Sequence, residues 1–223
     1  MGLFDKFFKT KGEAEVKDTG KATPPAGERP NEPLNVEHLK PWAGRIIEML
    51  KAQLNNDEII VLLFASGLAG IACHEAVKAT NGSFAVVETK DGKKYYFGDD
   101  VNKFLLEDKY SVYAFCSALS PIPEEILQKI IGRFANSVGN PNFKLWDTFA
   151  LEDAYQQVRA CWDGIFNNLI GPACKSPAEW PILLGIVVQN IIIWGSSKQP
   201  QKRLISMTVE CSNALSKMDK DSF

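Results

Sequence analysis

The sequence predicts a mainly α-helical fold, a multi-helix bundle-like domain of about seven helices with one β-hairpin inserted after a central buried helix. Residues 59–72 contain no charged residue and only one polar side chain, Ser66, which is typical of a helix buried on every side. Several other segments repeat apolar residues at helical spacing. Residues 84–97 instead place β-branched and aromatic residues around Asp91-Gly92, which indicates a hairpin.

The central helix is expected over about Asp57–Ala79. Asp57 and Glu58 bring negative charge to its N-terminus, and Asn55, Asn56 or Asp57 can cap it. Asn81-Gly82 supplies a left-handed stop at the other end. Its uncharged stretch rises about 21 Å, short of the roughly 30 Å hydrocarbon thickness of a membrane. We therefore expect a core helix rather than a membrane-spanning one.

One stripe of this helix, read at i, i+3 and i+4 spacing, carries Gly67, Gly70 and His74. Each glycine costs a helix about 1 kcal/mol relative to alanine, so some contact should gain from the missing side chains. A neighbouring helix that crosses closely is the simpler explanation. The alternative is a small-molecule cleft with a glycine floor and His74 at its mouth. On a later apolar helix, Gln189 or Asn190 is a candidate hydrogen-bond partner of Ser66 or His74, and Gln189 is the fourth residue of this candidate cleft.

Residues 1–34 are expected to form an amphipathic segment followed by a flexible linker, ahead of a single helical domain over residues 35–223. Residues 1–11 are net basic and would gather their large apolar side chains on one side of a helix: Leu3, Phe4, Phe7 and Phe8. Residues 12–34 contain four prolines and few apolar residues, which is typical of a linker. The segment is suited to docking on a partner protein or a membrane surface, or else on its own domain or a second copy.

The domain is expected to open with a helix from about Asn35 to Leu54. In the hairpin that follows the central helix, a type I′ turn at Asp91-Gly92 would pair Val87 with Tyr96. Two strands alone are marginal in water, so the hairpin should lie on the helices or pair with another chain.

Later helices are expected at about 101–107, 110–119, 124–137, 148–170, 178–194 and 201–218. Asp99 and Asp100 are expected to cap the first of them rather than to bind a metal. Ser176-Pro177-Ala178-Glu179 reads as a capping box, and the very apolar helix after it is the natural packing partner of the central helix. The last helix is expected to be amphipathic.

Three aromatic residues, Phe143, Trp146 and Phe149, lie in an expected loop after the turn at residues 139–142. The loop either folds back into the core, or Phe143 and Trp146 mark a patch that contacts a partner.

Composition limits the classes of function. A net charge of −2 argues against a protein that binds nucleic acid by neutralising phosphates. Five widely spaced cysteines, an odd number without a C-x-x-C pair, favour reduced thiols. We find no signal peptide pattern and no run of eighteen apolar residues. The predicted location is the cytoplasm, or export by a route that leaves no N-terminal mark.

Motifs for catalysis or cofactor binding are sparse. His38 and His74 are the only histidines, and His74-Glu75 lacks the second histidine of the H-E-x-x-H zinc motif. No phosphate-loop, dinucleotide or nucleophile-elbow pattern occurs. We therefore expect no metal and no cofactor, and an enzymatic role stays open but unsupported. The favoured hypothesis is a non-catalytic helical interaction protein, with a small-ligand-binding protein or enzyme as the alternative. A homodimer, through the hairpin edge or the aromatic loop, is compatible with either.

Overall fold

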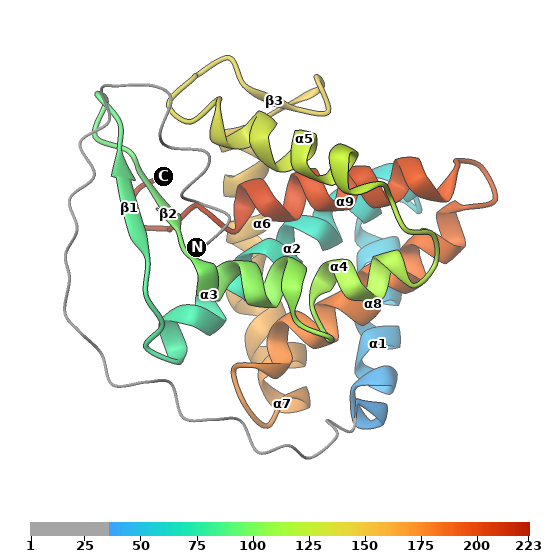
Figure 1. The fold of residues 1–223 in the computed structure, drawn as a ribbon. Coiled ribbons are helices and arrows are strands. Elements are labelled where there is room, and N and C mark those ends of the chain that lie inside the picture. The colour runs from blue at the N-terminus through green and yellow to red at the C-terminus, as the bar shows by residue number, and fades with distance from the viewer. Residues whose placement is uncertain (1–35) are drawn as a thin grey trace.

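The computed structural model describes residues 36–223 (Figure 1). The predicted N-terminal segment, with Leu3, Phe4, Phe7 and Phe8, lies outside the described residues. Within them the mainly α fold with an inserted β-hairpin is confirmed, with seven helices of six or more residues. In chain order these elements are α1 (Lys40–Gln53), α2 (Glu58–Ala79), β1 (Ala85–Glu88), β2 (Lys94–Phe97), α3 (Asp99–Asn102), α4 (Val112–Ser117), α5 (Glu124–Ala135), β3 (Lys144–Leu145), β4 (Phe149–Ala150), α6 (Leu151–Ile165), α7 (Gly171–Ala173), α8 (Glu179–Gly195) and α9 (Gln201–Leu215).

The central helix α2 begins and ends where its sequence predicts. The Asp57 carboxylate accepts the backbone N–H groups of Ile59 and Ile60, each at 3.0 Å, and Asn81 takes the left-handed conformation at φ 54°. In length and composition α2 matches a membrane-spanning helix, but 78% of its most apolar window is buried inside the fold. Its all-round apolar sequence is therefore explained by burial among the other helices.

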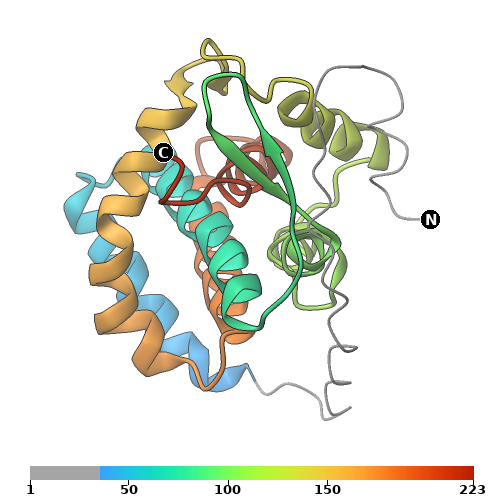
Figure 2. The same ribbon diagram turned by 90° about the vertical axis from the view of Figure 1, so that its left-hand side faces the viewer.

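Helices α8 and α9 pack along α2, and all three run through the middle of the body (Figures 1 and 2). The pairing of α2 with α8 is confirmed. The prediction of an amphipathic last helix is wrong, because α9 is buried on every side from Met207 onward and ends at Leu215. Its polar residues are covered because α2, α5 and α8 pack around it, and Glu210 meets Arg133 of α5.

The hairpin is present, but the predicted register is wrong by one residue. Val87 pairs with Tyr95, and Val86 with Tyr96. The Thr89 N–H donates to the Lys93 carbonyl at 2.9 Å, and Gly92 alone in this turn has a positive φ, of 82°. The connection is therefore a three-residue loop that ends in a left-handed glycine, not a two-residue type I′ turn, and the extra residue shifts the pairing.

The C-terminal residues hold this hairpin against the helices. The Tyr96 N–H donates to the Lys217 carbonyl at 2.8 Å, and Tyr95 forms an isolated bridge with Met218 (Figure 2). The Phe223 ring lies 5.0 Å from the ring of Tyr95. The hairpin thus gains a third, short strand-like neighbour, which meets the expectation that two strands need outside support.

Three other local predictions change in the structure. The helix predicted to end at about residue 170 continues further: residues 166–170 form a π-helical turn that runs on into α7, where Pro172 is tolerated in the first turn. The Glu179 carboxylate accepts from the Lys175 N–H at 2.7 Å, one residue before the predicted capping partner Ser176. Asp100 does not cap its own helix; it accepts instead from the Ser83 N–H at 3.1 Å and from Lys103.

Candidate functional site

The glycine stripe of α2 lies inside a close helix–helix contact. A Cβ atom added at Gly70 would sit 2.4 Å from the Ser212 carbonyl oxygen of α9. A Cβ atom at Gly67 would sit 2.8 Å from Leu215 and 2.9 Å from Val158. The close approach of α9 therefore accounts for both glycines, and α9 covers the face where the alternative cleft was predicted.

His74 is enclosed beneath the hairpin, with 1% of its surface exposed. Its Nδ1 lies 3.1 Å from the Ser216 carbonyl oxygen, and its Nε2 lies 2.9 Å from the Asp219 carboxylate. Each ring nitrogen therefore faces an oxygen atom of the C-terminal residues. With neither nitrogen free, His74 cannot serve as a general base or as a metal ligand in this arrangement.

Asp219 is the centre of this buried cluster. Besides His74, its carboxylate accepts from Lys78 Nζ at 2.6 Å and from the Asp221 N–H at 3.0 Å. Burial opposes its ionisation, but the hydrogen bonds from His74 and Lys78 outweigh burial and hold the pKa of this carboxyl well below its usual range. The cluster therefore fastens the C-terminal residues to α2 through charged hydrogen bonds.

Lys217 adds a second buried cation nearby. Its ammonium donates to the Asn102 side-chain oxygen at 3.1 Å, and burial lowers its pKa to about 8. Burial also raises the pKa of the Cys73 thiol to about 12, so this cysteine stays protonated. Both groups are enclosed, so neither reaches a substrate.

Gln189 stands apart from the predicted cleft residues. Its side-chain amide donates to the Phe115 carbonyl at 2.7 Å, and not to His74 or Ser66. The Ser66 hydroxyl donates within α2 to the Leu62 carbonyl at 2.7 Å. The structure therefore brings Gly67, Gly70 and His74 together along α2 under α9 and leaves Gln189 at the α4–α8 contact.

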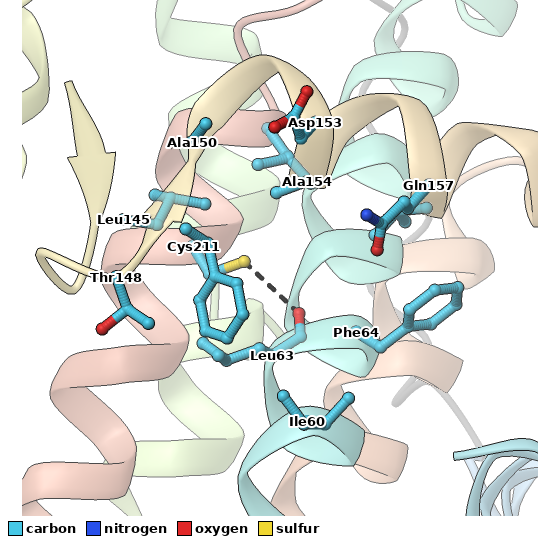
Figure 3. Close-up of a pocket in the computed structure, with 13 residues that line it drawn as sticks. Ile60, Leu63, Phe64, Leu145, Thr148, Ala150, Asp153, Ala154, Gln157 and Cys211 are labelled. Carbon is cyan, nitrogen blue, oxygen red and sulfur yellow. Dashed lines mark hydrogen bonds between the residues drawn. The ribbon is translucent and has the colours of Figure 1, made fainter. Parts of the chain in front are cut away.

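An open apolar pocket of about 250 Å³ lies near the other end of α2 (Figure 3). The first two turns of α2, the β3–β4 hairpin, α6 and α9 each provide part of its wall. Its lining residues are Ile60, Leu63, Phe64, Leu145, Thr148, Phe149, Ala150, Asp153, Ala154, Gln157, Val158, Cys211 and Leu215. None of the four predicted cleft residues is among them.

The polar side chains that line the pocket differ in their hydrogen bonds and ion pairs. Cys211 donates from Sγ to the Leu63 carbonyl at 3.3 Å, and burial raises its pKa to about 12 (Figure 3). Asp153 and Gln157 are exposed residues one turn apart on α6. Within residues 36–223, the Asp153 carboxylate forms no ion pair or hydrogen bond. The pocket therefore combines an apolar interior with an unpaired negative charge at its mouth.

The β3–β4 hairpin, one wall of this pocket, has an unusual turn. Trp146 and Asp147 both have φ of 56°, a left-handed pair that is usually filled by Asn-Gly. In the part of the chain that the structure describes, Trp146 Nε1 is the single buried side-chain nitrogen or oxygen without a hydrogen-bond partner. Such features cost free energy and tend to collect at functional sites.

A charged network holds this turn to the body. The Glu210 carboxylate, on α9, accepts from the Trp146 N–H at 3.1 Å and from Arg133 at 2.9 Å. Arg133 also binds Asp147 at 2.5 Å. Burial raises the pKa of Glu210 above its usual value despite these two donors.

The aromatic loop predicted at residues 143–149 is the β3–β4 hairpin, and its aromatic residues differ in burial. Phe143 is buried, with its ring 5.9 Å from Phe134, so it belongs to the core and not to an exposed patch. Trp146 is half-buried, and its contact with a partner stays a prediction.

No group of three or more possible metal ligands occurs within residues 36–223. Comparisons of the chain with protein-family models, with curated proteins and with solved structures give no match. The pocket was missed at the sequence level because its lining comes from four separate elements. Asp153 gave no signal of its own, because it lies on the exposed side of α6, away from the face of Leu151, Tyr155 and Val158.

Proposed function

We propose that this chain is a non-catalytic interaction protein whose folded body binds an amphipathic segment through the pocket between α2, α6, α9 and the β3–β4 hairpin. The observation that carries the proposal is an open apolar interior with the Asp153 carboxylate at its edge, which has no partner in the described part of the chain. An aromatic or aliphatic side chain fits the interior, and a lysine or arginine beside it fits the carboxylate.

The size of the pocket favours a side chain over a larger ligand. Its volume of about 250 Å³ is below the roughly 300–1,000 Å³ typical of small-molecule sites. The candidate catalytic groups also favour a binding role over an enzymatic one. His74 has both nitrogens engaged, and the high pKa of Cys211 keeps the pocket thiol protonated.

The N-terminal amphipathic segment is the second part of this proposal. Leu3, Phe4, Phe7 and Phe8 provide an apolar face for docking on a partner protein or a membrane surface. We also propose a cytoplasmic location, which is supported by five cysteines that are all free thiols. Homodimerisation stays a prediction.

Benzylamine, an aromatic ring with a cationic head, is a minimal probe of the pocket. We expect it to shift the amide NMR signals of residues 145–158 in the full chain at millimolar concentration, an affinity of about −4 kcal/mol. Benzyl alcohol, which lacks the charge, should bind about threefold more weakly, because an exposed ion pair contributes up to about 1 kcal/mol.

The variant Asp153→Asn should remove the preference for the amine. Asp163→Asn is the matched control, since Asp163 is an exposed carboxylate on the same helix but does not line the pocket. Equal binding of the amine and the alcohol by the wild type would overturn the role of Asp153.

A further inference from the structure

We infer that the pocket is occupied by residues 1–11 of the same chain, which insert an aromatic side chain and place a lysine on Asp153. This inference rests on the proposed function of the pocket and names its occupant. A partner of either the pocket or the N-terminal segment must then separate the two before it can bind.

The segment and the pocket are complementary in both polarity and charge. The segment carries Phe4, Phe7 and Phe8 together with three lysines within residues 1–11. The pocket offers apolar side chains from α2 and α6, including Phe64 and Ala154, and the Asp153 carboxylate, which no residue from 36 to 223 contacts by an ion pair (Figure 3). On a helical turn, Phe7 or Phe8 would share a side with Lys11, which stands four and three residues further on.

Residues 12–35 are long enough to connect Val36, where the folded body begins, with a segment bound in the pocket. Helix α1 has 14 residues and rises about 21 Å, and residues 54–57 join it directly to the pocket end of α2. Together with the three-residue turn Glu37–Leu39, this places Val36 roughly 27 Å from the end of α1 that adjoins the pocket. A polar, proline-rich coil the length of residues 12–35 spans about 25 Å on average.

Tethering makes the chain's own segment the favoured occupant. A linker whose average length matches the span gives an effective concentration in the millimolar range. A separate partner present at micromolar concentration must therefore bind about a thousandfold more tightly to compete equally. The same arithmetic favours docking within one chain over exchange between two copies.

Carbodiimide cross-linking of the full chain tests this arrangement. The reagent joins a lysine amine to a carboxylate with loss of water, and it requires the two groups to lie within ion-pair distance. We expect a cross-linked peptide between residues 1–11 and Asp153 in the monomer fraction. Asp153→Asn should abolish it, and Asp163→Asn should leave it unchanged.

A mixture of ¹⁵N-labelled and unlabelled chains identifies the donor. Cross-links within one isotope species support docking in the same chain. Cross-links that join the two isotopes, or no cross-link to Asp153, would overturn the inference.

Benzylamine separates failure of the occupant from failure of the pocket. A full chain with Phe4, Phe7 and Phe8 each changed to Asp should bind benzylamine at least threefold more tightly than the wild type, because the competitor is removed. Val16→Asp, in the linker, is the control and should behave as the wild type. Equal, measurable binding by all three chains would overturn self-occupancy and leave the pocket function intact. Absence of binding even in the triple variant would overturn the pocket function, and this inference with it.

Discussion

Polar groups lie near both ends of α2, but they differ in burial and in hydrogen bonding. Near the C-terminal end, His74 and Asp219 are almost fully enclosed, and each has its hydrogen-bonding partners. Near the N-terminal end, the pocket has at Asp153 a carboxylate without a partner among residues 36–223. The adjacent hairpin has an unbonded indole nitrogen at Trp146 and two left-handed residues in its turn.

The comparison separates structure from recognition. A buried polar group that has all its partners stabilises one arrangement of the chain and offers nothing to a ligand. A charge without a partner beside an apolar pocket can bind a second molecule through an ion pair and through apolar contact. By sequence alone His74 is the more conspicuous residue, yet the structure places the available chemistry around Asp153.

The largest loss of stability is expected near the C-terminal end of α2, in the cluster of His74, Lys78 and Asp219. Asp219→Asn removes the negative charge that holds His74 and Lys78, and breaking such a buried pair costs about 3–5 kcal/mol. Urea denaturation at pH 7 measures the loss. Asp221→Asn is the control, because Asp221 is exposed and meets Asp219 only through its backbone N–H.

The pH dependence of stability checks the same assignment. Because the pKa of Asp219 is lower in the folded protein than in the unfolded chain, its contribution is complete above about pH 4. That contribution should fall as the pH drops further toward the folded-state pKa. The difference between wild type and Asp219→Asn should therefore shrink in acid. A constant difference from pH 7 to pH 2 would contradict the charged role of Asp219.

A smaller but still large effect is expected from the glycine contact. Gly70→Ala places a methyl group 2.4 Å from the Ser212 carbonyl oxygen, and that backbone cannot move without α9. We expect a loss of about 3 kcal/mol in the free energy of unfolding. Gly44→Ala is the matched control: nothing lies within 4 Å of the added atom in α1. It should stabilise the protein by about 1 kcal/mol through helix propensity. A fall in unfolding free energy below 1 kcal/mol for Gly70→Ala would mean that the α2–α9 contact is looser than described.

Sequence reasoning located the elements better than it located the site. The uncharged run of α2, its Asp57 cap and the hairpin were predictable, because each follows from neighbours along the chain. The hairpin register was not, because one extra loop residue changes every pair. The enclosure of α9 was missed because the helices that cover it, chiefly α2 and α5, lie far from it in the sequence.

The pocket was beyond sequence reasoning for a related physical reason. Its walls come from α2, the β3–β4 hairpin, α6 and α9, and no local pattern states that these elements meet. The glycines were read correctly as a sign of close contact. What the sequence left open was whether a helix or a ligand made that contact, and the position of α9 decides it.

The smallest effect is expected in the turn at the pocket wall. Asp147→Gly removes the cost of a side chain in the left-handed region, about 1 kcal/mol. It also removes the ion pair with Arg133, which is worth less than 1 kcal/mol because the Asp147 side chain is 89% exposed. Asp147→Asn isolates the second term, since asparagine tolerates this conformation as aspartate does. We expect the glycine variant to be about 0.5–1 kcal/mol more stable than the asparagine variant in urea denaturation. If the two are equally stable, the turn is not strained, and the pocket end of α2 differs from the His74 end only in its unpaired polar groups.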